Sequence, residues 1–173
     1  APRQFGGHQE GGLRSGTENV PGIVGMGKAC EIARRDLADQ NVLLAYLRDR
    51  LEGAIRRVLP ELRFNGHPEL RLPHILSVSV DGVRGEALVR EMDKQGYAVS
   101  AGSACTSESP TLSHVLTALN LSAGEALGTV RFSLGRTNTA EQIDRAADAF
   151  VRIVSRLQAL AELEEAAGRR GCR

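Results

Sequence analysis

The spacing of apolar residues changes at Pro60, and this change constrains the fold more than any other feature of the chain. Before Pro60, apolar residues recur every three or four positions, which is typical of an amphipathic helix. These residues are Leu44, Leu47, Leu51, Ile55 and Val58. After Pro60, apolar and polar residues alternate between His74 and Val80, which is typical of a strand with one buried face. The pattern therefore predicts helices first and strands later.

The order of the expected elements indicates a small α+β domain. Helices are expected at 21–37, 44–58, 84–94, 112–119, briefly from 122, and at 139–157, and strands at 62–65, 74–80, 97–99 and 129–134. Two segments, Ser122 to Glu125 and Thr139 to Gln142, have the form of capping boxes, which mark the start of a helix. Strands between residues 62 and 134, with helices packed on one face of their sheet, give the α+β class.

The bulk composition excludes several classes of protein. A net charge of +1 gives no strong field toward nucleic acid or an anionic membrane, and 3% aromatic residues are too few to stack single-stranded nucleic acid. No apolar run approaches the about 20 residues that span a bilayer, and the first residues lack the apolar segment of a secretion signal. The three cysteines, Cys30, Cys105 and Cys172, fit no disulfide framework or zinc pattern. We expect a cytoplasmic protein with no metal site.

A run of small residues, SAGSACTS at positions 100–107, surrounds Cys105. Small side chains let the backbone pass close to another group and leave the thiol uncrowded. The run lies between an expected strand and a loop rich in serine and proline. On chemistry alone, a reactive or ligand-binding thiol and an ordinary loop cysteine both fit this setting.

Three segments in register resemble one family of enzymes. They are GGHQEGGLRSGTENV at 6–20, VSAGSACTS at 99–107 followed by LSHVL at 112–116, and VRFSLGR at 130–136 followed by Asn138 and Thr139. Together they resemble the pyridoxal-phosphate-dependent cysteine desulfurases of the class V aminotransferase superfamily. The form around Cys105 is similar to the branch that supplies iron–sulfur clusters and nitrogenase. The likeness runs from about residue 5 to residue 157.

The resemblance implies the aspartate-aminotransferase-type fold (fold type I), an α/β homodimer with a large cofactor domain and a smaller C-terminal domain. Only the later part of that fold matches this chain. We therefore expect residues 1–20 to be a loop from the cofactor domain and residues 21–60 to form connecting helices. Residues 61–160 would form the C-terminal small domain with the catalytic-cysteine loop, and residues 161–173 a disordered tail.

The resemblance also implies roles for three residues. Cys105 matches the nucleophile that attacks the sulfur of L-cysteine and becomes a persulfide, leaving L-alanine. Arg131 matches the residue that pairs with the substrate α-carboxylate, a task that suits the two parallel donors of a guanidinium. Thr17 matches a threonine that reaches the cofactor phosphate of the partner subunit.

The lysine that a pyridoxal-phosphate enzyme needs for its covalent link to the cofactor has no match in this chain. Its two lysines, Lys28 and Lys94, fall within expected helices and outside the family's Ser-x-His-Lys setting. We expect the chain to be inactive alone, as a fragment, a truncated product or a split subunit. Three interpretations remain: a cysteine desulfurase that passes sulfur to an iron–sulfur scaffold or another acceptor protein, a noncatalytic sulfur-carrier or interaction module, and a relative that acts on selenocysteine.

Overall fold

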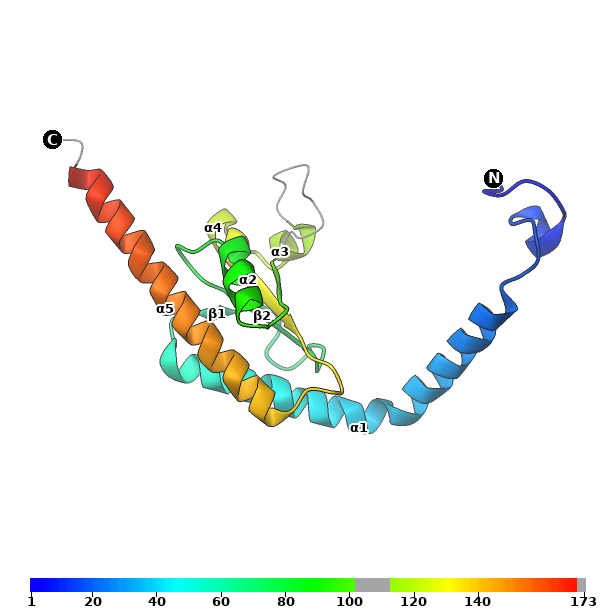
Figure 1. The fold of residues 1–173 in the computed structure, drawn as a ribbon, viewed down its shortest axis with the longest axis horizontal. Helices are drawn as coiled ribbons and strands as arrows, with labels where there is room; N and C mark the ends of the chain where they lie inside the picture. Colours follow the sequence, from blue (N-terminus) through cyan, green and yellow to red (C-terminus); the bar gives the residue numbers. More distant parts are fainter. Residues whose placement is uncertain (102–112, 171–173) are drawn as a thin grey trace. The chain divides into compact units, whose positions relative to one another are not determined.

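The computed structural model describes residues 1–101 and 113–170 (Figure 1). The chain divides into two compact units, Ala1–Asp39 and Gln40–Arg173. Within the described residues, no helix combines the length and apolarity that a membrane crossing requires, and no cluster of three or more His, Cys, Asp or Glu side chains could hold a metal ion.

The first unit contains the short 3-10 helix η1 (Gln9–Gly12) and the first part of helix α1 (Val20–Val58). Helix α1 is one continuous helix, whereas the sequence analysis predicts two. The linking residues, 38–43, contain neither proline nor glycine, so nothing in them breaks a helix. The boundary between the units therefore falls inside α1, and the segment expected at 21–60 as connecting helices is almost all α1.

The second unit is built on a four-stranded antiparallel sheet. Its strands are β1 (Arg63–Phe64), β2 (Ile75–Ser79), β3 (Ser100–Ala101) and β4 (Thr129–Ser133), in the order β1-β2-β4-β3. The α+β class predicted for this region is confirmed. Strand β3 lies later than the predicted 97–99, because Tyr97 belongs to the end of the preceding helix. Its N–H donates to the Met92 carbonyl at 3.0 Å, and the N–H of Gly96 donates to the Asp93 carbonyl at 2.8 Å; together these bonds form a Schellman motif.

The register of β2 against β4 separates an apolar face of the sheet from a polar one. Leu76 pairs with Phe132 and Val78 pairs with Val130, and these four side chains are buried. Because side chains alternate along a strand, the intervening pairs point to the opposite face. Those pairs are Ile75–Ser133, Ser77–Arg131 and Ser79–Thr129.

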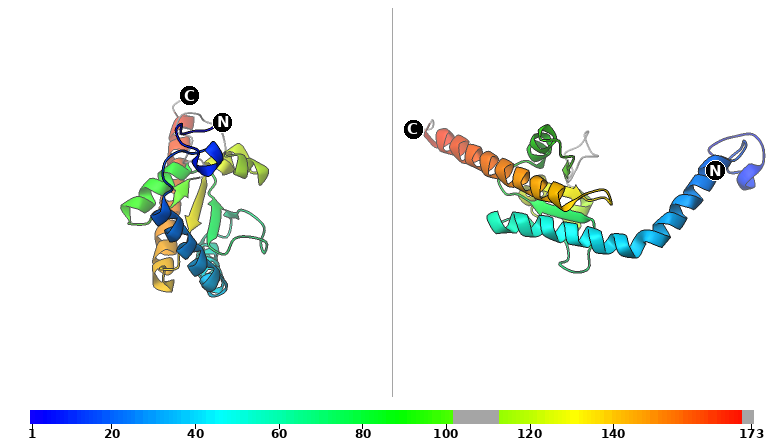
Figure 2. Two further views of the ribbon diagram at one scale, coloured as in Figure 1. Left: turned by 90° about the vertical axis from the view of Figure 1, so that its right-hand side faces the viewer. Right: turned by 60° about the horizontal axis from the view of Figure 1, so that its bottom comes forward.

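Helices cover the apolar face and form the core with it. The second part of α1 and the long helix α5 (Ala140–Arg170) lie on the same side of the sheet (Figures 1 and 2), and α2 (Gly85–Lys94) packs against α5. Fully buried side chains of the three helices meet the sheet there, among them Leu51, Leu88 and Phe150. The rings of Phe150 and Phe132 meet edge to face, with centroids 5.2 Å apart.

Two short helices, α3 (His114–Ala118) and α4 (Ala123–Leu127), precede β4. The capping box predicted at Ser122 and Glu125 is confirmed. The one predicted at Thr139 is confirmed by reciprocal bonds with Gln142, of 3.1 and 3.3 Å. Helix α5 corrects one prediction, because it continues to Arg170 where a disordered tail is expected from residue 161. Residues 158–166 are Gln, Ala, Leu and Glu, which are all good helix formers.

Candidate functional site

Arg131 lies near the middle of β4 on the polar face of the sheet. It is paired with Ser77 of β2 on one side and with Ser100 of β3 on the other. Both neighbours are small, so the long side chain has room on this face. Among the described residues, no hydrogen bond or ion pair engages its guanidinium. Within the part of the chain that the structure describes, the positive charge of Arg131 is therefore not paired.

Arg131 lines a pocket of about 270 Å³ on this face. Its apolar wall consists of Leu72, in the loop between β1 and β2, Val115 of α3, and Leu119 just after α3. Polar groups of the sheet, Ser77 among them, give the other side. A cation beside an apolar wall suits a small molecule that carries one anionic group and an uncharged remainder.

The other arginine of this pocket, Arg71, is already neutralised. Its Nη2 lies 2.7 Å from Oε2 of Glu52, and its Nε is buried without a partner among the described residues. The neighbouring Arg48 is also buried and donates from Nη1 to the Leu72 carbonyl at 3.1 Å. These contacts tie the pocket wall to α1, and they leave Arg131 as the cation that a ligand could use.

Cys105, the sequence-predicted nucleophile, lies outside the described residues. The described residues on either side of that segment are Ala101 and Ser113, and both line the pocket that holds Arg131. The last described residue before that segment and the first one after it thus both lie at this pocket.

Thr17 belongs to the first unit, in the loop just before α1. Its side chain is exposed, and its backbone carbonyl accepts a hydrogen bond from Nη1 of Arg14 at 2.7 Å. The preceding residue, Gly16, has a φ of 88°, a conformation that favours glycine.

Both lysines lie on helices in exposed ion pairs with the residue three positions away. Lys28 Nζ lies 2.8 Å from Glu31, and Lys94 Nζ lies 2.6 Å from Glu91. Neither lysine lines the pocket of Arg131. Among the described residues, the pocket thus contains the cation of Arg131 and no lysine amine.

A chain of hydrogen bonds beside Arg131, buried or partly buried, was not predicted from the sequence. Asn65 donates from Nδ2 to Ser79 Oγ at 2.8 Å and to Ser77 Oγ at 3.2 Å. Ser79 Oγ and Thr129 Oγ1 are 2.8 Å apart, and Thr129 Oγ1 donates to the Glu125 carbonyl at 2.7 Å. The only sequence signal was the polar alternation at Ser77 and Ser79, which predicts a strand and gives no partner.

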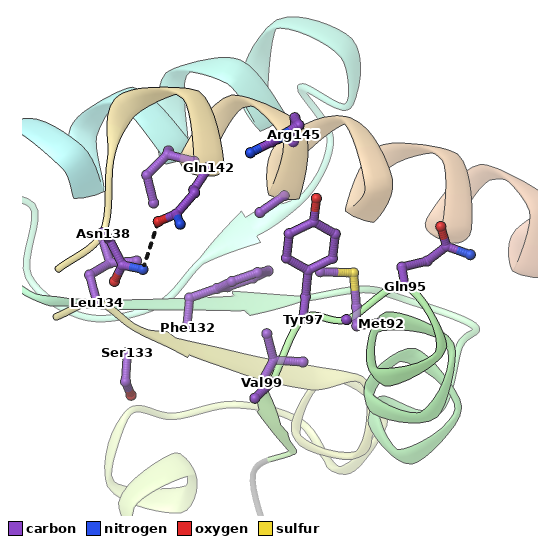
Figure 3. Close-up of a pocket in the computed structure, with 14 residues that line it drawn as sticks. Met92, Gln95, Tyr97, Val99, Phe132, Ser133, Leu134, Asn138, Gln142 and Arg145 are labelled. Carbon is purple, nitrogen blue, oxygen red and sulfur yellow. Dashed lines mark hydrogen bonds between the residues drawn. The ribbon is translucent and has the colours of Figure 1, made fainter.

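A second pocket, of about 500 Å³, lies on the other side of the sheet, between the end of α2, β4 and the start of α5 (Figure 3). Its amide side chains serve the start of α5. Gln142 Oε1 accepts from the Thr139 N–H at 3.1 Å and from Asn138 Nδ2 at 3.5 Å, and Asn138 Oδ1 accepts from the Gly135 N–H at 2.7 Å. With these groups occupied, the pocket of Arg131 is the stronger candidate site.

The family model and the curated proteins that match this chain point to the same family. The model of the family Aminotransferase class-V matches residues 6–146. A cysteine desulfurase of Gluconacetobacter diazotrophicus is 44% identical over 153 residues, covering 88% of this chain and 38% of the relative. Cysteine desulfurase IscS 1 of Archaeoglobus fulgidus is 43% identical over 162 residues, covering 94% and 42%. The chain spans about two fifths of the length of these relatives.

Solved structures give the same result. A NifS-like protein matches with a TM-score of 0.75 and 35% identity, covering 89% of this chain and 38% of that one. A NifS-like protein from Rickettsia africae matches with a TM-score of 0.76 and 29% identity, covering 90% and 40%. The likeness thus includes both units of this chain and well under half of either known structure.

Proposed function

Because the chain belongs to the aminotransferase class-V family, we propose that it carries the sulfur-accepting half of a cysteine desulfurase site. In this reaction, sulfur leaves L-cysteine and L-alanine remains. The observation that carries the proposal is the guanidinium of Arg131, which has no partner in residues 1–101 and 113–170 and lies in a pocket that is also lined by both flanks of the Cys105 segment. The identity of 44% to a cysteine desulfurase supports it.

Arg131 is proposed to hold the α-carboxylate of the substrate. A guanidinium offers two parallel N–H donors that match the two carboxylate oxygens, and its charge does not titrate near neutral pH. The apolar wall of the pocket, with Leu72 and Val115, carries no compensating charge. The arrangement orients an amino acid by its carboxylate and leaves an uncharged side chain free to reach the nucleophile.

Cys105 is proposed as that nucleophile. Its thiolate attacks the substrate sulfur, the sulfur–sulfur bond forms as the carbon–sulfur bond breaks, and the electron pair of the broken bond stays with the carbon skeleton, which gains a proton and leaves as L-alanine. Pyridoxal phosphate, when bound, supplies the electron sink for this cleavage. Cys105 follows Ala101 by four residues, and a fully extended tether of that length spans about 14 Å at most.

Further parts of the site are proposed for Thr17 and for other chains. The exposed hydroxyl of Thr17 is proposed to reach the cofactor phosphate across a homodimer. Lys28 and Lys94 are occupied in helical ion pairs, so we propose that the cofactor lysine is not one of them. The persulfide on Cys105 would pass to an iron–sulfur scaffold or another acceptor protein in the reducing cytoplasm.

The ion pairs of Lys28 and Lys94 also favour a second candidate function, a sulfur-carrier module that receives its persulfide from another chain. The two candidates are separated by adding pyridoxal phosphate and L-cysteine to the protein mixed with a polypeptide that supplies the cofactor lysine. The desulfurase then gives an absorbance band of the bound cofactor and releases alanine from L-cysteine, and both signals require this chain. The carrier gives neither and is still labelled when it is mixed with a persulfide donor.

Substitution of Cys105 tests the nucleophile directly. In the presence of a polypeptide that supplies the cofactor lysine, the C105S variant is expected to lose persulfide labelling at least a hundredfold after incubation with L-cysteine and pyridoxal phosphate, because a hydroxyl cannot hold the transferred sulfur. Cys30, exposed on α1, provides the matched control, and C30S is expected to label like the native protein. Labelling that survived in C105S would refute the role of Cys105.

A further inference from the structure

In the chain of hydrogen bonds beside Arg131, the donor and acceptor of each bond can be assigned by starting from the Glu125 carbonyl. The Glu125 carbonyl can only accept, so the Thr129 hydroxyl donates its hydrogen to it, over 2.7 Å. Thr129 Oγ1 must then accept in its 2.8 Å contact with Ser79, so the Ser79 hydroxyl donates to Thr129. Each hydroxyl has one hydrogen, and both are now assigned.

This assignment determines the orientation of the Asn65 amide. The only hydroxyl hydrogen of Ser79 is directed at Thr129, so Ser79 Oγ accepts from Asn65. The Asn65 atom that lies 2.8 Å from Ser79 Oγ must therefore be the amide nitrogen. The second hydrogen of that nitrogen is directed at Ser77 Oγ, 3.2 Å away. Asn65 is 9% exposed and its backbone N–H bonds to the Ser77 carbonyl at 2.8 Å, so its backbone is held against β2 as well as its amide nitrogen.

Ser77 is therefore an acceptor toward Asn65 and keeps its own hydrogen for another group. No acceptor for that hydrogen occurs among the described residues. Ser77 lies directly opposite Arg131 on the same face of the sheet, where paired Cβ atoms are about 5 Å apart. Both residues line the same pocket. As far as the structure describes the chain, the pocket thus holds a hydroxyl hydrogen and a guanidinium that have no partner.

We propose that Ser77 is a second ligand of the carboxylate held by Arg131, donating its hydroxyl hydrogen to a carboxylate oxygen, with Asn65 as the residue that orients it. The proposal rests on the proposed function, because it assigns a partner to the same bound carboxylate. An anion accepts from both donors, whereas an ammonium group is repelled by Arg131 and has no hydrogen-bond acceptor to offer. The pair Ser77–Arg131 therefore selects the carboxylate end of an amino acid.

The test measures binding without turnover. The probe is 3-mercaptopropionate, which has the thiol and carboxylate of cysteine and no amine to react with a cofactor. Its dissociation constant is measured by NMR titration of the ¹⁵N-labelled chain at fixed ionic strength. S77A is expected to weaken binding about tenfold or more, as for a lost hydrogen bond to a charged group. S77T keeps the hydroxyl and is expected to stay within about threefold of native.

Three further variants make the result decisive. S133A removes a serine from the same face of β4, outside this pocket, and is expected to bind like the native protein. N65A leaves Ser77 in place without its donor and is expected to weaken binding. R131Q tests the proposed function itself. The role of Ser77 alone would be overturned if R131Q lost binding while S77A bound like the native protein. It would also be overturned if S77A and S77T weakened binding equally. Native binding in R131Q would overturn the carboxylate site as well.

Discussion

Gly128 is a residue whose identity the packing dictates. A Cβ atom built on it would lie 2.0 Å from the carbonyl oxygen of Val80 and 2.8 Å from that of Val83. Both contacts are to backbone atoms, which cannot rotate away as a side chain can. The carbonyl of Gly128 also accepts the Val80 N–H at 3.1 Å. The segment after β2 and the start of β4 can approach this closely because no side chain separates them.

The G128A variant is therefore expected to unfold about 2–4 kcal/mol more easily, the range of a steric conflict in a packed region. G124A is the matched control, four residues earlier in α4, where an added Cβ meets nothing within 4 Å. Alanine there is expected to stabilise by about 0.5–1 kcal/mol, since it favours the helix over glycine. Urea unfolding of both variants gives the comparison, and equal midpoints would contradict the steric argument.

At this scale the sequence indicated Arg131 as a candidate and gave no sign of its neighbours. An arginine inside a short apolar strand is conspicuous in the sequence, because a buried unpaired charge would be costly. In the structure, Arg131 is exposed on the polar face of the sheet. The role of Ser77 depends instead on the β2–β4 register and on Asn65, twelve positions earlier. The partners of the Ser77 hydroxyl can be worked out only when three separate stretches of the chain are placed together. No spacing rule carries that information.

At the scale of elements, Glu125 joins the start of α4 to β1. Its carboxylate accepts from the Ser122 backbone N–H at 2.7 Å and from Nη1 of Arg63 at 2.7 Å. The first of these bonds, with the second adding to it, lowers the pKa of Glu125 from 4.5 to about 2. Both partners favour the ionised carboxylate.

This lowered pKa makes part of the stability dependent on pH. A carboxylate whose folded pKa lies below its unfolded pKa stabilises the fold above about pH 4.5, and the contribution is lost as the pH falls toward about 2. Unfolding midpoints in urea measured between pH 6 and pH 2 are expected to decline less steeply for E125Q than for the native protein. E141Q, at an exposed glutamate on α5, is the control and is expected to follow the native slope. A native-like slope in E125Q would show that the Glu125 contacts do not persist in solution.

Elements whose signals are local were predictable, and those decided by packing were not. The capping box at Ser122 needs four adjacent residues, and its bonds are present. The end of α2 and the position of β3 depend on the same few residues, and Tyr97 is taken by the helix cap. The continuity of α1 across residues 38–43 was missed because the apolar stripe weakens there, although no residue stops a helix.

At the scale of the whole molecule, burial is distributed unevenly along α1. Between Val20 and Asp39 no residue is buried, and apolar side chains such as Val24 are exposed. From Leu44 onward the same helix contributes Leu47, Leu51 and Ile55 to the core of the second unit, each no more than 1% exposed. Helical stability in proteins comes mostly from the packing of one face, so the two parts of α1 have different sources of stability.

Hydrogen exchange of the backbone amides is expected to divide α1 accordingly. Amides from 47 to 58 open only with the core and exchange slowly, whereas those from 23 to 37 exchange through local fraying at a much lower free energy. L51A is expected to cost about 2–5 kcal/mol, as a fully buried leucine does, and to raise exchange throughout the second unit. V24A, in the exposed part, is expected to change the free energy of unfolding by no more than about 0.5 kcal/mol. Uniform protection along α1, or a V24A effect as large as that of L51A, would mean that the first part of the helix is packed against another surface in solution.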